Sequence, residues 1–305
     1  MDVVRLAVIC GPTAAGKSGL ALRLAETAGL GIISADSRQV YRGFDIGTAK
    51  PTAAERSRVP HEGIDVADAT ERYSAARWME AVDGWRAALE ATGRGVVVVG
   101  GTGLYLRTLS APLFEEPPLD PDARAALAAL LAPLPLDELR RQCLALDPPR
   151  AHLGRTQLLR AIEVARLTGR PISEWHREHA RAPRYDVRYL YVDPGDVLHA
   201  WIAQRIDAML ADGWVDEVRA LMTTVPPDAP AWNATGYHTI RQVAEGTLSL
   251  ARARDQILIA TRQYAKRQRT WFRHQLPATQ VVHINSAASD AFDRTRSWWS
   301  EEKEP

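Results

Sequence analysis

The stretch LAVICGPTAAGKS at residues 6–18 decides the fold of this chain. Residues 6–10 are a short apolar run that predicts a buried strand, and residues 17–28 carry leucines among small residues, which suits a helix. Between them, GPTAAGKS at 11–18 matches the pattern G-x-x-x-x-G-K-[ST] in full. A strand, a glycine-rich turn and a helix in this order predict a phosphate-binding loop.

The chemistry of such a loop follows from its backbone. Glycines let successive N–H groups turn towards one anion, and the helix N-terminus adds partial positive charge. Lys17 adds a full charge, and the hydroxyl of Ser18 is the expected protein ligand of a Mg²⁺ ion. The loop predicts a bound di- or triphosphate without saying which. The residues expected to hold it are Gly11, Pro12, Thr13, Ala14, Ala15, Gly16, Lys17 and Ser18.

Further apolar runs extend the strand–helix pattern along the chain. Residues 31–34, GVVVVG at 95–100 and YLYV at 189–192 are expected strands. Helices are expected between them, for example over residues 73–92. Buried strands that alternate with helices favour a parallel sheet. The predicted fold class is therefore α/β, with a P-loop NTPase-like parallel sheet as its core.

The composition changes near residues 111–121, where APLFEEPPLDP holds four prolines. From about residue 122 to 179 the sequence is rich in Ala, Leu and Arg, with helical spacing and no strand candidate. We expect a discontinuous core of residues 1–115 and 186–285, interrupted by a helical insertion at 116–185. Residues 286–305 are mostly polar and are expected to form a frayed tail.

Composition excludes several classes of protein. The 305 residues are 46% hydrophobic and 25% charged, the balance of an ordinary globular chain rather than of a disordered one. Two cysteines make neither a disulfide framework nor a zinc site, and a cytoplasmic location is expected. No apolar run approaches the roughly 18–20 residues of a membrane span. With a net charge of +1, any nucleic-acid site must be a local patch.

A carboxylate follows the second predicted strand. Asp36 lies at the edge where ligands of open α/β sheets bind. There it can accept a proton from a nucleophile that attacks beside a bound pyrophosphate. A helix cap or an outer ligand of Mg²⁺ is the alternative role. Ser37, Arg38 and Gln39 follow with polar side chains able to read the edge of a base.

The stretch TRQYAKRQRTWFR at residues 261–273 predicts a helix with one basic stripe, in which basic residues recur at intervals of 4, 3 and 4. Such a stripe can follow a phosphate backbone, and Trp271 can stack on an exposed base. A solvated amphipathic face is the alternative. Lys266 favours a function, because only four of the 38 basic residues are lysines. The stripe consists of Arg262, Lys266, Arg269 and Arg273.

Four segments together resemble the tRNA dimethylallyltransferase family, in order and in spacing. They are GPTAAGKS, ADSRQVYRGFDIGTAKP at 35–51, VGGTGLYLRTL at 99–109 and TRQYAKRQRTWFR. The resemblance is to the bacterial type without a C-terminal zinc finger. It implies a monomeric enzyme that transfers a dimethylallyl group from dimethylallyl diphosphate to N6 of the adenosine on the 3′ side of the tRNA anticodon. It also implies Mg²⁺ as cofactor and the anticodon stem-loop as partner, bound by the helical insertion at 116–185.

The resemblance assigns roles to individual residues. Asp36 is then the general base, Thr102 lies near the reacting centre, and Lys17 neutralises the leaving diphosphate. The expected tRNA contacts are Asp36, Ser37, Arg38, Gln39, Thr102, Arg124, Gln157, Arg160, Asn233, Gly236, Tyr237, His238, Lys266, Arg267, Gln268, Arg269, Trp271 and Arg273.

One segment departs from the family pattern. Leu153 and Gly154 stand where the family usually has an Asn-Asp pair, and Gln157 stands where it has an arginine. Arg155 is the expected substitute for that arginine.

Two other functions are compatible with the phosphate loop. The acceptor of the prenyl group can be a free adenine mononucleotide, although this needs neither the insertion nor the basic helix. An ATP-dependent small-molecule kinase also fits the loop, but it leaves residues 34–51 and 261–273 unexplained.

Overall fold

The computed structural model describes residues 4–111, 117, 119–178 and 183–301. Contacts divide the chain into two compact units. The first combines Met1–Ser110 with Pro183–Pro305, and the second is Ala111–Ala182. These limits lie within a few residues of those expected for the insertion.

The first unit is built on a parallel sheet with the strand order β3-β2-β4-β1-β5-β6. The central strand β1 pairs with β4 on one side, with Val8 beside Val98, and with β5 on the other, with Val8 beside Tyr189. The predicted parallel α/β fold is confirmed, while the short edge strands β3 and β6 were not expected. The strands are β1 Val4–Cys10, β2 Leu30–Ala35, β3 His61–Glu62, β4 Gly95–Gly100, β5 Tyr185–Val192 and β6 Val281–Ile284.

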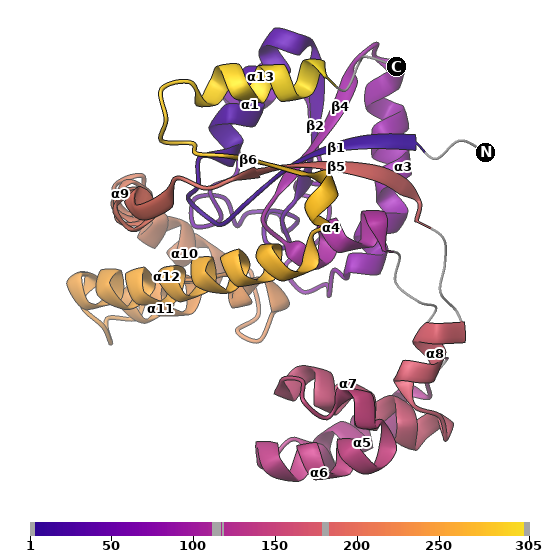
Figure 1. Ribbon diagram of the computed structural model, residues 1–305. Helices are drawn as coiled ribbons and strands as arrows, with labels where there is room; N and C mark the ends of the chain where they lie inside the picture. Colours follow the sequence, from indigo (N-terminus) through magenta and orange to yellow (C-terminus); the bar gives the residue numbers. More distant parts are fainter. Residues whose placement is uncertain (1–3, 112–116, 118, 179–182, 302–305) are drawn as a thin grey trace. The chain divides into compact units, whose positions relative to one another are not determined.

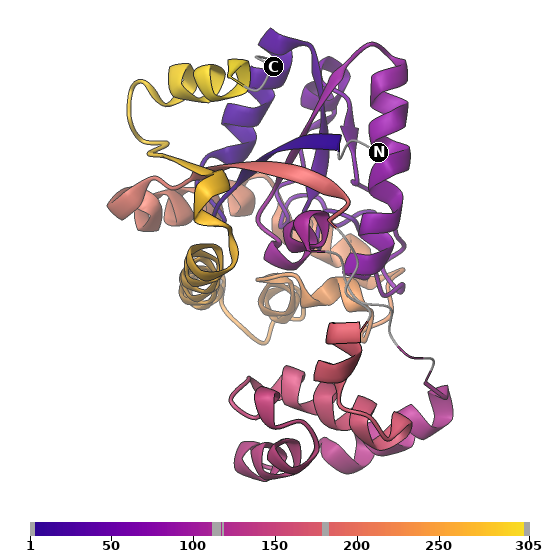
Figure 2. The same ribbon diagram turned by 45° about the vertical axis from the view of Figure 1, so that its right-hand side comes forward.

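Helices cover both faces of this sheet (Figures 1 and 2). On one face α1 (Lys17–Ala28) and α13 (Ala291–Ser300) lie side by side over the strands. On the other face α3 (Ala75–Ala91) and α4 (Gly103–Ser110) bury Trp78 and Leu106. The short helix α2 is Ala53–Arg58. Because β2, β4 and β1 are neighbours and parallel, the loops that follow them meet at one edge of the sheet.

The expectation of a frayed tail at residues 286–305 is wrong for most of that segment. Helix α13 buries Trp298 and Trp299 against α1 and the sheet. The guanidinium of Arg23 lies 4.0 Å from the ring centre of Phe292 on the same helix. These large aromatic side chains share one helical face, and their burial outweighs the polar composition of the segment.

Further helices gather beside the carboxyl edge of the sheet and form their own core with Phe44, Trp214, Trp232 and Tyr237 (Figure 1). Among the residues that the structure describes, every helix is too short or too polar to cross a bilayer. These helices are α9 Leu198–Ala211, α10 Trp214–Met222, α11 Tyr237–Ala244 and α12 Leu250–Gln275. Single 3₁₀ turns are η2 Gly195–Val197, η3 Pro230–Asn233 and η4 Ala278–Gln280.

The second unit is helical in its described part, as its composition predicts. Its core holds Leu139, Cys143, Leu158 and Ile162, all completely buried. Asp120 caps the first helix by accepting a hydrogen bond from Ala123 N at 2.7 Å. The elements are α5 Pro121–Leu131, α6 Leu136–Leu146, η1 Pro148–Arg150, α7 Arg155–Thr168 and α8 Ile172–Glu178.

Candidate active site

Three loops at the carboxyl edge of the sheet bring the predicted catalytic residues together. Asp36 follows β2 and Thr102 follows β4, and these two strands are neighbours in the sheet. Ser37 N donates to Thr102 Oγ1 at 3.0 Å, and Thr102 N donates to Ala35 O at 3.2 Å. Thr102 therefore ties its own loop to the loop that carries Asp36.

The third loop is the phosphate loop, which ends at the start of α1. Ala14 and Gly16 have φ angles of 60° and 81°, the left-handed conformation that turns successive N–H groups towards one side. The first N–H groups of α1 have no partner inside the helix. Lys17 Nζ donates to Pro12 O at 2.6 Å. Burial, with a smaller effect of Arg205, lowers the pKa of Lys17 to about 8. The loop thus has the geometry of an anion site.

Arg205 is a residue of this site that the sequence reasoning missed. It lies on α9, with its Nη1 atom 3.5 Å from Thr13 Oγ1 of the phosphate loop. Burial lowers its pKa, while the carboxylate of Asp36 opposes that effect. The signal in the sequence was an arginine on the helix face that also carries Ile202 and Ile206. A charged residue on an apolar face is unusual unless it has a ligand or a partner.

A cavity of about 350 Å³ in the first unit connects these groups. One part of its wall is polar and carries Thr13, Asp36 and Arg205. Another part is apolar and carries Met209 and Trp214. A site with charged and apolar walls suits a small molecule with an anionic head and a short hydrocarbon tail. The remaining lining residues are Ala14, Ser37, Arg38, Gly47, Thr48, Ile202, Ile206, Asn233, Ala234, Thr235, Ile257, Thr261, Tyr264 and Arg267.

Comparison with known proteins identifies the relatives of this site. The family model "IPP transferase" matches residues 39–275, and the model "Isopentenyl transferase" matches residues 4–65. The tRNA dimethylallyltransferase of Gloeobacter violaceus is 44% identical, over 88% of this chain and 89% of that protein. The one from Myxococcus xanthus is 42% identical over 93% of this chain and 94% of that protein. This chain belongs to the IPP transferase family.

Solved structures agree with this assignment. The tRNA isopentenylpyrophosphate transferase of Bacillus halodurans matches with a TM-score of 0.68 and 31% identity, over 98% of this chain and 96% of that one. A eukaryotic dimethylallyltransferase acting on tRNA matches with a TM-score of 0.76 at 24% identity, which shows the shared fold. The resemblance drawn from the four sequence motifs is therefore confirmed, and with it the phosphate-loop fold of the IPP transferases.

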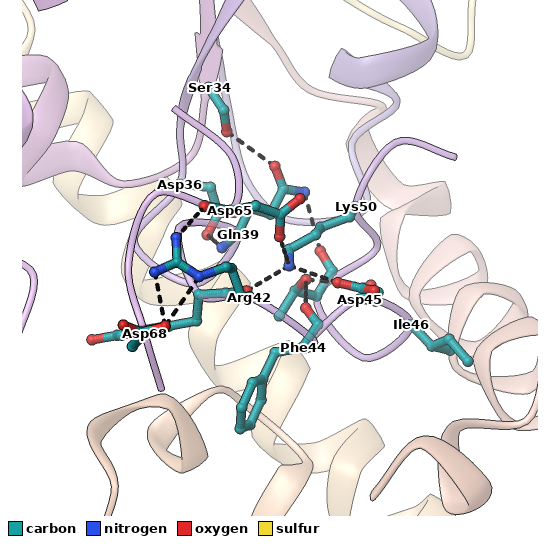
Figure 3. A network of polar contacts seen from close by, with 12 residues as sticks. Ser34, Asp36, Gln39, Arg42, Phe44, Asp45, Ile46, Lys50, Asp65 and Asp68 are labelled. Atoms are coloured by element: carbon teal, nitrogen blue, oxygen red, sulfur yellow. Dashed lines mark hydrogen bonds and ion pairs between the residues drawn. The ribbon is translucent and has the colours of Figure 1, made fainter. Parts of the chain in front are cut away.

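Within the family site, the segment from Ser34 to Asp68 is held by its own polar groups (Figure 3). Ser34 Oγ donates to Gln39 Oε1 at 3.0 Å, and Gln39 Nε2 donates to Thr48 O at 3.2 Å and to Ala49 O at 3.0 Å. The side-chain amide of Gln39 is thus fully bonded inside the chain. These bonds shape the segment behind Asp36, and the expected contact of Gln39 with tRNA stays a prediction.

Lys50 fastens the same loop from the other side (Figure 3). Its Nζ atom donates to Tyr41 O at 2.5 Å and pairs with Asp45 and Asp65, each at 2.6 Å. The Lys50 side chain is only 4% exposed, so its charge needs these partners. Arg42 adds an ion pair with Asp68 at 2.8 Å. The network gives Asp36 a rigid support.

The predicted basic stripe on α12 is only partly free to meet RNA. Lys266, Arg267 and Arg273 are exposed. Arg269 instead donates to both carboxylate oxygens of Asp193, at 2.8 and 2.6 Å, and so lies in a fixed pair beside the phosphate loop. The remaining stripe member, Arg262, is half-buried. Trp271 is also half-buried. Gln268 is buried, which favours an internal role over its expected RNA contact.

The predicted tRNA contacts around the start of α11 also divide into buried and exposed residues. Tyr237 is completely buried, and its hydroxyl donates to Glu217 Oε1 at 2.7 Å. Gly236 has a φ of 94°, and a Cβ atom there would lie 2.3 Å from Trp214 Cη2. The burial of Tyr237 favours a packing role over its expected tRNA contact, whereas Gly236 is half-buried and stays a predicted contact. Asn233 and His238 are exposed and remain predicted contacts.

In the insertion, the predicted RNA residues are paired with chain groups. Arg124 Nε donates to Glu163 Oε1 at 2.6 Å, and Arg160 also pairs with Glu163. Gln157 Oε1 accepts from Gly154 N at 3.1 Å and caps α7. Arg155 donates to two carbonyl oxygens after α5, at 2.7 and 2.5 Å, and so caps that helix. Its expected substitution for the family arginine stays a prediction.

The donor set at the phosphate loop fits a magnesium ion that arrives with a phosphate ligand. Among the described residues, no group of three or more His, Cys, Asp or Glu side chains is placed to hold a metal ion. Ser18 is exposed in the first turn of α1, and its hydroxyl makes no hydrogen bond within the described chain. Mg²⁺ typically keeps several waters and binds few protein oxygens together with substrate phosphates. Ser18 therefore suffices as the protein ligand expected from the sequence.

Proposed function

We propose that this chain transfers a dimethylallyl group from dimethylallyl diphosphate to N6 of the adenosine beside the tRNA anticodon, and releases diphosphate. The observation that carries the proposal is the cavity in which the phosphate loop, Asp36 and an apolar wall meet. The names of the relatives, tRNA dimethylallyltransferases at 42–45% identity, support the same reaction.

The diphosphate end of the donor occupies the phosphate loop. The backbone N–H groups at the start of α1, Lys17 and Arg205 surround that position with positive charge. An allylic C–O bond breaks readily when its leaving group is stabilised, and fixed positive groups in a partly buried site do this well. A Mg²⁺ ion held by Ser18 and the diphosphate would add further charge neutralisation when bound.

The acceptor amine approaches from the side of Asp36. Asp36 Oδ1 accepts hydrogen bonds from Arg38 N at 2.8 Å and Gln39 N at 3.4 Å, which fixes the carboxylate. Within the described chain, Oδ2 makes no hydrogen bond and is available as a base. N6 bonds to C1 of the allyl group as the C1–O bond to diphosphate breaks, and Asp36 takes the proton that N6 loses.

The adenine must leave the stacked anticodon loop to reach this carboxylate. Exposed Lys266, Arg267 and Arg273 on α12 are suited to the RNA backbone, and Arg38 and Asn233 line the cavity near the expected base. The enzyme acts as a monomer in the cytoplasm, where its tRNA substrate is found.

The deciding experiment is one incubation of the protein with Mg²⁺, dimethylallyl diphosphate and unmodified tRNA, followed by mass spectrometry of the digested nucleosides. We expect prenylated adenosine at the position next to the anticodon. Parallel reactions contain AMP in place of tRNA, or ATP in place of the prenyl donor. Prenyl-AMP would move the acceptor to a mononucleotide, and ATP consumption without prenylation would make the chain a kinase.

A further inference from the structure

Gln268 joins two loops of the active site through its two amide ends. Its Oε1 atom accepts a hydrogen bond from Thr13 N of the phosphate loop at 2.8 Å. Its Nε2 atom donates to Gly101 O, next to Thr102, also at 2.8 Å. The residue is 7% exposed, so water replaces neither bond easily.

The Gln268 contacts complete a continuous chain of hydrogen bonds across the site. Gly101 is followed by Thr102, whose hydroxyl accepts from Ser37 N, next to Asp36. The loop that holds the donor and the loop that holds the base are thus linked through two side chains, Gln268 of α12 and Thr102. Within the described residues, no other side chain is hydrogen-bonded to both the phosphate loop and the loop that follows β4.

We propose that Gln268 is a positioning residue that sets the spacing between the diphosphate of the donor and the base Asp36. The proposal rests on the proposed prenyl transfer. It gives α12 two separate duties: the exposed Lys266 and Arg267 meet RNA, while the buried Gln268 holds the reacting groups in register. Transfer reactions are sensitive to such spacing, since a displacement of about 1 Å can cost roughly 10²-fold in rate.

An amide is the group that both contacts require. Thr13 N–H needs an acceptor, and Gly101 C=O needs a donor. A glutamate carboxylate of the same shape satisfies Thr13 but places a negative oxygen against the Gly101 carbonyl. The protonated carboxylic acid, by contrast, donates through O–H and accepts through C=O, so it reproduces the pattern of the amide. The contact with the Gly101 carbonyl can therefore be tested by changing the pH, which protonates or deprotonates a glutamate placed at position 268.

The test compares Gln268→Glu with the parent enzyme in single-turnover and steady-state assays between pH 5.5 and about 8.5. We expect kcat of the variant to fall by about 10²-fold at the upper end of this range. Affinity for tRNA and its salt dependence should stay unchanged. The ratio of the variant's kcat to that of the parent should rise towards one as pH falls, because burial raises the pKa of the introduced carboxyl and protonation restores the donor. Gln256→Glu, the same change at an exposed position of α12, is the matched control and should leave kcat unchanged.

Binding of inorganic pyrophosphate, measured by calorimetry at the same pH values, tests the inference without tRNA. Gln268→Glu should weaken it several-fold at high pH and recover at low pH relative to the parent. The pyrophosphate measurement tests the role of Gln268 even if the parent enzyme does not prenylate tRNA. That failure would contradict the proposed function but not the role of Gln268.

A second variant covers the case in which Gln268→Glu does not fold. A Cβ atom on Gly101 would lie 2.6 Å from Gln268 Nε2, the far end of a flexible side chain. Gly101→Ala should therefore push the amide aside and lower kcat without any recovery at low pH. A kcat ratio for Gln268→Glu that is independent of pH, or a loss of tRNA affinity with kcat intact, would overturn the proposal.

Discussion

Two arginines of the first unit and two of the insertion are held in opposite ways. In the first unit, Arg269 forms a two-pronged pair with Asp193 and also donates to Gly195 O at 2.8 Å, while Arg205 lies against the phosphate loop. In the insertion, Arg124 and Arg141 have side chains that are 51% and 78% exposed, and each pairs with a carboxylate close by. Exposed pairs are worth only about 0–1 kcal/mol. Arg269 and Arg205 are therefore held in place near the site, whereas the exposed guanidinium groups of Arg124 and Arg141 can change partners at little cost.

The largest expected effect is the loss of turnover when the base in the first unit is removed. Asp36→Ala should lower kcat by roughly 10²–10⁴-fold, because the mutant lacks the positioned base. Binding of tRNA, measured by filter retention, should change little, since the carboxylate adds no attraction for phosphate. Full turnover in this variant would remove Asp36 from the mechanism.

The next largest effect is on stability and concerns α13, which packs against α1 on one face of the sheet. Trp298→Ala should lower the free energy of unfolding by about 3–5 kcal/mol, because the buried indole of α13 leaves a cavity against α1. Leu130→Ala in the insertion removes a side chain that is 69% exposed and should change stability by less than about 0.5 kcal/mol. Denaturant titration of both variants measures these changes. Equal losses in the free energy of unfolding would contradict the packed position of α13.

A pH profile sharpens the role of the fixed charges. The pKa of Lys17 is lowered to about 8, so its ammonium carries charge below that pH and loses its proton as pH rises through it. Therefore kcat/KM for dimethylallyl diphosphate should fall by about tenfold per pH unit above pH 8. Lys17→Arg keeps its charge throughout this range, and its profile should stay flat to higher pH. A flat profile in the parent enzyme would contradict the assignment.

The smallest effect tests the exchangeable charges. Replacing Lys266 and Arg267 together by Gln should weaken tRNA binding and reduce the slope of log affinity against log salt by about 1.5, the loss of two phosphate contacts. Arg269→Gln should leave that slope unchanged, because Asp193 already holds this guanidinium. Binding measured at several salt concentrations separates the two cases. Arg124→Ala should reduce the same slope by about half as much as the double replacement of Lys266 and Arg267, if the ion pair of Arg124 with Glu163 opens to RNA.

Much of the site was readable because its signals are local. A phosphate loop needs only a short run of residues, and the polar residues after β2 and β4 meet because parallel strands end at a common edge. The sequence says least about residues whose side chains turn inward. Gln39, Tyr237 and Gln268 look like surface recognition residues in the sequence, yet each is bonded to groups that lie elsewhere in the chain. Burial of one amide or phenol depends on what packs over it, which a short motif does not encode.

By itself the sequence determined the phosphate loop, the parallel α/β core, the helical insertion and the family, because these follow from residue spacing and from the hydrophobic pattern. Only the tertiary structure decided which charges are fixed and which are free. Arg205 reaches the phosphate loop from α9, and Gln268 reaches two loops from α12, across separations of 192 and 255 residues from Thr13. The physical reason is that a buried polar group must find its partner in space, and chain folding brings those partners together from distant segments.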